Sequence, residues 1–231
     1  MFSATVLELD PRVETERIVL AIREQVIGTL RKRGVVVGLS GGVDSSVVAA
    51  LSARALGRDR VLALFMPEHD SSSESLTLGR LAAESLGVSA LVEDIGPALD
   101  AAGCYRRQRE AIQRVLPEYG PGWKCKLVLP SILEGERLNV TRLVVADPAG
   151  ASRTVRLTAP AYLELVAATN FKQRIRKITE YYHADRLNYA VAGTPNRLEY
   201  DQGFFVKQGD GAADFKPIAH LYKTQVYQLA R

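Results

Sequence analysis

The chain has 231 residues, with 30 lysines and arginines against 26 aspartates and glutamates, so its formal net charge is +4. Hydrophobic residues make up 47% of the chain, which is typical of a globular protein and excludes a disordered one. No run approaches the roughly 18 apolar residues of a membrane-spanning helix, and the first residues do not resemble a signal peptide. The cytoplasm is therefore the expected compartment, and no membrane partner is expected.

The cysteines, histidines and basic residues exclude further classes of function. Cys104 and Cys125 form no C-x-x-C motif and are too few for a disulfide framework. Three scattered histidines complete no zinc-ligand spacing with them. The basic runs 31–33 and 172–177 are short and lack interleaved aromatics, so a nucleic acid is not an expected partner. A modest positive charge also suits an anionic small molecule.

The first half of the chain alternates between helical and strand patterns. Asp10 and Pro11 are typical of a helix start, and apolar residues at helical spacing predict a helix over 11–33. The segments that follow are expected to be a strand over 35–39, a helix over 43–56, a strand over 60–66, a helix over 73–86, a strand over 89–93 and a helix over 97–114. This alternation predicts an α/β fold with a doubly wound parallel sheet and helices on both faces.

The second half departs from this alternation before returning to it. Two apolar runs around Asp147-Pro-Ala-Gly150 predict a β-hairpin within an inserted stretch of about residues 121–159. A long helix is expected over 160–183, followed by a strand over 186–192, loops over 193–218 and a helix from Tyr222. The buried face of the long helix is expected to carry Leu163, Val166, Ala167, Ile175 and Ile178. We expect a single domain over 1–231. Since the last helix has no stop signal, we also expect a truncated C-terminus.

The segment Ser40-Gly-Gly-Val-Asp-Ser-Ser46 lies between a predicted strand and a predicted helix. Two glycines allow a tight turn that brings backbone N–H groups close to an anion, and the helix N-terminus favours negative charge there. Serine hydroxyls add donors, and Asp44 can hold a Mg²⁺ ion that bridges phosphate oxygens. The loop is neither a Walker A loop nor a G-x-G-x-x-G motif. The plain alternative is a glycine-rich turn with a serine cap.

This S-G-G-x-D-S loop after a buried strand resembles the N-type ATP pyrophosphatases, which split ATP into AMP and pyrophosphate to adenylate an acceptor. The resemblance implies the adenine nucleotide α-hydrolase-like form of the fold. It also implies an ATP site that contains Gly38, Leu39, Ser40, Gly41, Gly42, Val43, Asp44, Ser45 and Ser46. Backbone groups of residues 64–66 are expected to face the adenine.

Four later segments, in this order and spacing, resemble the ammonia-dependent NAD synthetases. They are Asn170-Phe-Lys-Gln-Arg174, Gly193-Thr-Pro-Asn-Arg-Leu-Glu199, Gly203 to Asp214, and Leu221-Tyr-Lys223. The resemblance implies a ligase that uses ATP and ammonia to amidate deamido-NAD, giving NAD, AMP and pyrophosphate through an adenylated intermediate. Mg²⁺ is the implied cofactor, ATP is the co-substrate, and a homodimer is the implied assembly.

The same resemblance assigns roles to individual residues. Deamido-NAD contacts fall on Asn170, Arg174, Lys207 and Asp214. ATP contacts fall on Thr194 and Lys223, and Glu199 shares the metal with Asp44. Asp210 and Lys223 are the catalytic candidates, with Asp210 at the ammonia site. From the residues alone, Asn170 and Arg174 could equally form a solvated helix face, Glu199 a surface carboxylate, and Asp210-Gly211 a hairpin turn.

Two other functions are compatible with the phosphate loop. One is a sulfur-transfer ligase of the same superfamily, although the chain lacks the paired cysteines that such enzymes tend to carry. The other is a nucleotide-binding module without catalysis, for which ATP would stabilise the fold without release of AMP.

Overall fold

The computed structural model describes residues 3–128 and 141–231. Its helices and strands are, in chain order, η1 (Ala4–Leu7), α1 (Pro11–Arg23), the π-helix η2 (Glu24–Thr29), β1 (Val35–Gly38), α2 (Val43–Leu56), η3 (Arg58–Arg60), β2 (Val61–Phe65), α3 (Ser73–Leu86), β3 (Ser89–Val92), α4 (Gly96–Ala101), α5 (Cys104–Gln113), β4 (Lys124–Val128), β5 (Arg142–Ala146), β6 (Ser152–Arg156), α6 (Ala159–Leu187), β7 (Ala190–Ala192), α7 (Arg197–Asp201) and α8 (Lys223–Leu229).

The chain divides into two compact units. The first unit contains Met1–Ala98 and Gln173–Arg231, and the second contains Leu99–Lys172. The helix α6 begins in the second unit and ends in the first. The expected insertion of about residues 121–159 falls within the second unit, and the single-domain organisation stays a prediction.

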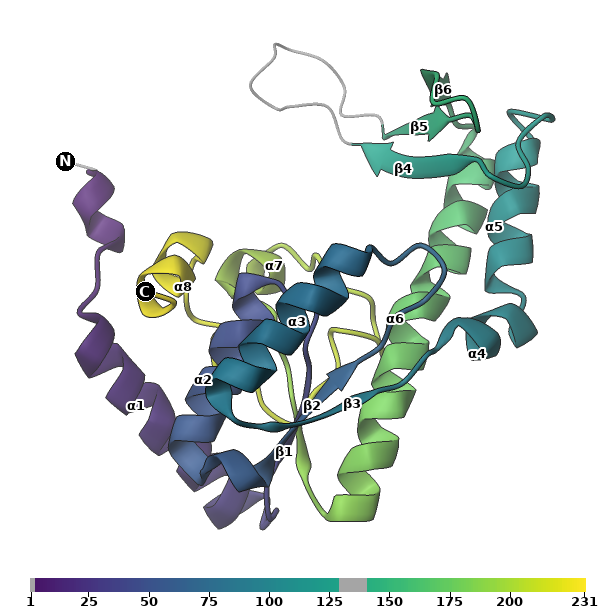
Figure 1. Ribbon diagram of the computed structural model, residues 1–231. Helices are drawn as coiled ribbons and strands as arrows, with labels where there is room; N and C mark the ends of the chain where they lie inside the picture. The colour runs from purple at the N-terminus through teal and green to yellow at the C-terminus, as the bar shows by residue number, and fades with distance from the viewer. Residues whose placement is uncertain (1–2, 129–140) are drawn as a thin grey trace. The chain divides into compact units, whose positions relative to one another are not determined.

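The first unit is built on a parallel sheet with strand order β3-β2-β1-β7. Val35 and Val37 of β1 point into a core formed with α1, α2 and α3, whereas Val36 points to the opposite face. On that opposite face Val36 packs with Ala184 of α6. Figure 1 draws α6 beside the strands of this sheet. Helices therefore cover both faces of the sheet, and the predicted doubly wound α/β fold is confirmed.

The buried face of α6 differs from the prediction. Leu163 and Ile178 are 66% and 64% exposed, whereas Lys177, Glu180 and His183 are buried. These polar side chains can be buried because each has a partner: Lys177 pairs with Glu180, and His183 hydrogen-bonds Glu93 at 2.8 Å. None of the five predicted residues is buried, so the prediction from apolar periodicity was wrong. The buried face carries Ala161, Leu165 and Ala168 in the first half of α6, and paired polar side chains together with Ala184 in the second half.

Several boundaries also differ from the sequence-based expectations. The predicted helix over 97–114 is two helices, because Gly103 adopts a left-handed φ of 72° between α4 and α5. The helix α6 continues to Leu187, so β7 begins later than predicted. Helical structure from Pro11 ends in a π-helix at Thr29 rather than at residue 33, and the predicted loops over 193–218 contain the short helix α7.

The second unit contains an antiparallel sheet with strand order β4-β5-β6. The hairpin predicted around residues 147–150 is confirmed: the Gly150 N–H donates to the Asp147 carbonyl, and the Asp147 carboxylate accepts from the Ala151 N–H at 2.9 Å. Strand β4 was not predicted, and residues 138–140 of the expected hairpin lie outside the described residues. Leu143 and Val145 of β5 form the core of this unit with α5 and α6.

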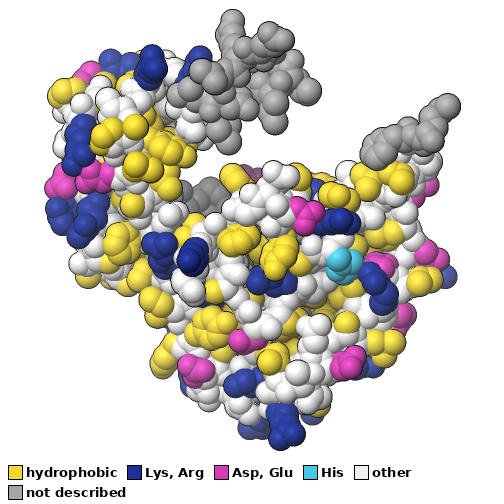
Figure 2. Space-filling model, turned by 180° about the vertical axis from the view of Figure 1, so that it is seen from behind, with side chains coloured by type: hydrophobic (Ala, Val, Ile, Leu, Met, Phe, Trp, Pro, Cys, Tyr) yellow, Lys and Arg dark blue, Asp and Glu magenta, His cyan; other side chains and the backbone are white. Residues whose placement is uncertain are grey.

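On the face drawn in Figure 2, Lys and Arg side chains are interspersed with acidic and apolar side chains and form no continuous basic stripe. Within residues 3–128 and 141–231, none of the helices combines the length and the hydrophobicity of a membrane-spanning helix.

Candidate active site

The loop between β1 and α2 has the geometry of an anion-binding turn. Gly41 adopts a φ of +80°, which favours glycine, and a Cβ there would lie 2.5 Å from the Ser75 carbonyl oxygen. Gly42 is the N-cap of α2 and has no side chain to cap the helix. The loop can therefore bend tightly against α3 only with glycine at position 41.

The loop's own hydroxyls hold it in place and leave backbone donors open. Ser40 Oγ accepts from the Gly42 N–H at 3.3 Å, and Ser45 Oγ donates to the Gly42 carbonyl at 3.0 Å. Within the described residues, the N–H groups of Val43, Asp44 and Ser45 have no acceptor. These three groups are the unsatisfied donors of the first turn of α2, where a phosphate is favoured by hydrogen bonding and by the helix dipole.

A cavity of about 180 Å³ lies directly at this loop. It is lined by Ser40, Gly42, Asp44, Ser45, Thr194, Pro195, Glu199, Phe204 and Asp210. Thr194 follows β7, and Glu199 lies on α7, so the carboxyl ends of β1 and β7 both contribute to the same cavity. The structure thus brings together seven predicted residues from the loop and the segment 194–210, as expected for a ligand site at the carboxyl edge of a parallel sheet.

Asp44 lies beside the first residue of α8. Its Oδ2 atom accepts a hydrogen bond from Lys223 Nζ, across 179 residues of sequence. Its Oδ1 atom is buried and, among the described residues, has no hydrogen-bond partner. An unpaired buried carboxylate oxygen is costly without a ligand, so Oδ1 fits a cation or a donor that arrives with the substrate.

Glu199 lies at the third position of α7. Its Oε2 atom accepts from the Asn196 N–H at 3.0 Å, and the Asn196 side chain accepts in return from the Leu198 and Glu199 N–H groups. This capping box fixes the direction of the Glu199 side chain toward the cavity. Among the described residues no cluster of three or more His, Cys, Asp or Glu side chains could bind a metal alone. Two carboxylates completed by phosphate oxygens is, however, the usual way in which Mg²⁺ binds beside a nucleotide.

A larger cavity of about 590 Å³ continues from the same loop. It is bounded by Gly38, Leu39 and Ser40, by residues after β2 including Met66, by Thr194 and by Asp210. Its other wall is a polar face of α6, formed by Gln173, Arg176, Lys177 and Glu180. These four residues were not predicted from the sequence, although their spacing at i, i+3, i+4 and i+7 places them on one helix face and could have identified them.

The electrostatics of this wall centre on Glu180. Burial raises the pKa of the Glu180 carboxyl above its usual value, and the neighbouring Lys177 ammonium opposes that rise. The Lys177 Nζ and Glu180 Oε2 atoms are 2.6 Å apart, with both side chains less than a tenth exposed. A desolvated ion pair of this kind is therefore part of the cavity wall.

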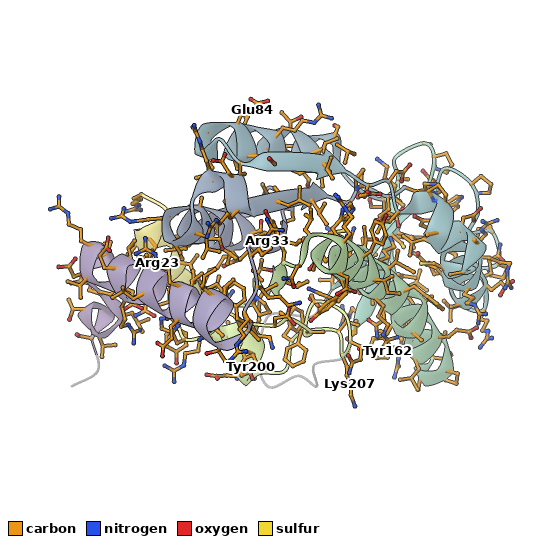
Figure 3. The ribbon with its side chains drawn as sticks, turned by 90° about the horizontal axis from the view of Figure 1, so that it is seen from below. Arg23, Arg33, Glu84, Tyr162, Tyr200 and Lys207 are labelled. Atoms are coloured by element: carbon orange, nitrogen blue, oxygen red, sulfur yellow. The ribbon has the colours of Figure 1, made fainter. Side chains whose placement is uncertain are left out.

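The four residues assigned to deamido-NAD line neither cavity. Lys207 is exposed and extends away from the ribbon in Figure 3, while its carbonyl oxygen accepts from Arg174 Nε at 3.2 Å. Asp214 accepts from the Val191 N–H at 2.7 Å and from the Tyr181 hydroxyl at 3.2 Å, and burial together with Asp214 raises the pKa of Tyr181 to about 12. Asn170 belongs to the second unit. Their contact with substrate stays a prediction.

Comparison with known proteins identifies the family. The family model described as NAD synthase matches residues 14–115 and 137–231. The chain belongs to the NAD synthase family. Every candidate site residue named above lies within these two matched ranges, and residues 116–136, at the start of the expected insertion, are unmatched.

Individual members of the NAD synthase family are similar over most of the chain. An NH(3)-dependent NAD(+) synthetase of Mesorhizobium japonicum is 69% identical over 224 residues, which is 97% of this chain and 70% of that protein. The protein of the same name from Thermotoga maritima is 42% identical over 218 residues, covering 94% of this chain and 71% of that protein. The solved NH3-dependent NAD synthetase of Campylobacter jejuni has a TM-score of 0.67 and 27% identity, covering 96% and 73% of the two chains.

Proposed function

We propose that this chain is an ammonia-dependent NAD synthetase, a ligase that amidates deamido-NAD with ammonia at the expense of ATP. The observation that carries the proposal is the cavity at the phosphate loop, where open N–H donors meet Asp44, Thr194 and Glu199. The family match and the names of the similar proteins support the choice of acceptor. ATP is cleaved to AMP and pyrophosphate in the reaction.

In the first step the nicotinate carboxylate attacks the α-phosphorus of ATP, and pyrophosphate leaves. The N–H groups of Val43, Asp44 and Ser45 bind the phosphates as negative charge shifts onto the leaving group. We assign Lys223, whose Nζ atom pairs with Asp44, to the same phosphates, and the Thr194 hydroxyl adds a donor from the end of β7. These residues favour the charge distribution of the transition state without forming a covalent bond to substrate.

In the second step ammonia attacks the acyl carbon of the adenylate and AMP leaves. Asp210 lines both cavities, and its Oδ1 atom accepts from the Val206 N–H at 2.7 Å, which fixes the carboxylate. We assign Asp210 to holding ammonium and accepting the proton that the amide nitrogen loses. Asn170, Arg174, Lys207 and Asp214 are assigned to deamido-NAD by family likeness.

Asp44 and Glu199 are the proposed Mg²⁺ ligands, because the buried Oδ1 atom of Asp44 has no partner among the described residues and Glu199 lines the same cavity. When bound, the ion would neutralise phosphate charge and orient the leaving pyrophosphate. The Lys223 ammonium, which pairs with Asp44 Oδ2, would then bind phosphate oxygens beside it.

A cytoplasmic homodimer is the proposed assembly. Val13 and Leu20 of α1 and Ile27 of η2 recur at seven-residue spacing and are 65%, 62% and 43% exposed. An apolar stripe of this kind on one helix suits a contact with a second copy of the chain.

The proposal is tested by following AMP and NAD together when the chain is incubated with ATP, Mg²⁺, ammonium and deamido-NAD. We expect equal amounts of AMP and NAD, and neither product when deamido-NAD is omitted. Stabilisation by ATP without release of AMP would favour a nucleotide-binding module instead. Release of AMP without NAD, under the same conditions, would point to a ligase with a different acceptor.

A further inference from the structure

In the buried ion pair between Lys177 and Glu180, one carboxylate oxygen does not contact the lysine. Lys177 Nζ donates to Glu180 Oε2 at 2.6 Å, and both residues line the larger cavity. Glu180 Oε1 accepts no hydrogen bond from the described residues, although the residue is 7% exposed. A carboxylate oxygen in this environment requires a donor, and the cavity is where a donor can come from.

Gly38 allows this oxygen to lie close to the backbone at the end of β1. A Cβ at residue 38 would lie 2.8 Å from Glu180 Oε1 and 3.2 Å from Met66 Cε. With no side chain at residue 38, the Glu180 carboxylate can lie directly against the backbone at the end of β1. Gly38, Met66 and Glu180 also line the larger cavity, so a ligand group in the cavity over the end of β1 can reach the Oε1 atom.

The backbone at the carboxyl ends of β1 and β2 indicates which part of a nucleotide would lie beside Glu180. The Leu64 carbonyl accepts from the Leu39 N–H on the β1 side, and the Phe65 carbonyl accepts from the Glu93 N–H on the β3 side. By this alternation the backbone polar groups of Met66 point toward the β1 side, but β1 ends at Gly38 and does not pair with them. In the described part of the chain, the N–H and carbonyl groups of Met66 therefore have no hydrogen-bond partner. They form a donor–acceptor pair suited to the edge of a base.

With phosphates at residues 40–46 and the base edge at Met66, the ribose lies between them, over the end of β1. Gly38 is the last residue of β1, and the Oε1 atom of Glu180 lies directly against it. We propose that Glu180 is a specificity residue for the ribose of ATP and accepts a hydrogen bond from its 2′-hydroxyl. The inference rests on ATP being the substrate in the proposed function, and Lys177 positions the carboxylate.

Two properties of the pair suit this role. Oε2 is held by Lys177, so the orientation of Oε1 is set before the nucleotide binds, which reduces the entropy cost of binding. A hydroxyl donates to a carboxylate in a charge-assisted hydrogen bond, and this hydrogen bond is stronger where water is excluded. Loss of the hydroxyl would leave Oε1 buried without a donor, so a 2′-deoxy nucleotide should bind about 10- to 100-fold more weakly.

The test measures binding of ATP, 2′-deoxy-ATP, 3′-deoxy-ATP and the 6-deamino analogue of ATP to the full chain, as Mg²⁺ complexes, by calorimetry. Binding needs no deamido-NAD, so the result is independent of the proposed acceptor. The wild-type chain should prefer ATP over 2′-deoxy-ATP by the factor given above. In the double variant Lys177→Met, Glu180→Leu that preference should fall to near unity, because ATP loses affinity while 2′-deoxy-ATP keeps its own.

Two controls accompany the binding experiment: the stability of the double variant and a conservative variant of Glu180. The double variant replaces an ion pair by apolar groups of similar size, which is often neutral for stability, and urea unfolding would confirm that it folds. Glu180→Gln keeps an acceptor without the charge and should show an intermediate preference for ATP. An unchanged ATP preference in the double variant would overturn the assignment, as would a loss of discrimination confined to the 3′-deoxy or the 6-deamino nucleotide. A wild-type chain that binds ATP with this preference but forms no NAD would leave the inference standing and refute the proposed function.

Discussion

Replacing Asp44 by asparagine is expected to lower the rate of AMP formation by about 10³-fold at millimolar Mg²⁺, which corresponds to about 4 kcal/mol of transition-state stabilisation. The carboxylate has one oxygen on Lys223 and one buried oxygen without a partner among the described residues. Asparagine keeps the size of the side chain and removes the charge, so both the ammonium and a Mg²⁺ ion lose their counter-charge. The rate is measured from AMP released in the presence of deamido-NAD and ammonium.

Two further variants separate loss of charge from loss of structure. Glu199→Gln can still accept from the Asn196 N–H, because glutamine also forms a capping box, and it should therefore fold normally while AMP formation falls. Asp59→Asn removes a carboxylate that is 95% exposed on η3 and should leave the rate unchanged. Near-normal rates in Asp44→Asn would remove Asp44 from the proposed metal site.

Replacing Gly41 by alanine is expected to lower kcat/KM for ATP by roughly 10²-fold, because strain and collision together displace the loop and its N–H donors. A residue with a side chain pays about 1–2 kcal/mol for the left-handed conformation. The added Cβ would also lie 2.5 Å from the Ser75 carbonyl oxygen and 3.0 Å from Leu78 Cβ, both on α3. The measurement is the steady-state rate as a function of ATP concentration.

Gly57 provides a matched control for this variant. It has a φ of +92°, and an added Cβ would meet nothing within 4 Å. Gly57→Ala therefore introduces backbone strain without the collision and lies outside both cavities at the loop. It should lose a little stability and keep wild-type activity; equal losses of activity in the two variants would mean that the loop geometry is not what matters.

The parts of the fold that could be predicted are those whose signal is local. Short buried runs such as residues 35–37 and 61–65 are apolar throughout because both faces of a parallel sheet are covered, and the structure confirms both as strands. The loop was recognisable in part through Gly41, because glycine is required where the φ is positive and a neighbouring backbone is close.

The parts that could not be predicted depend on tertiary partners. Lys177 and Glu180 resemble surface residues in sequence, and only the fold shows that they are buried together beneath β1. Lys223 and Asp44 are far apart in the chain, so their contact follows from the packing of α8 near α2. Strand β4 carries two lysines and exposes most of its residues, so it lacks the apolar pattern that identifies a strand.

In the proposed reaction, this nucleotide site activates a carboxylate by transferring AMP to it. The most direct test uses deamido-NAD labelled with ¹⁸O in its nicotinate carboxylate, with mass spectrometry of the AMP formed in the presence of ATP, Mg²⁺ and ammonium. Attack of the carboxylate on the α-phosphorus, followed by displacement by ammonia, places one labelled oxygen in the phosphate of AMP. AMP that forms together with NAD but carries no label would contradict this mechanism.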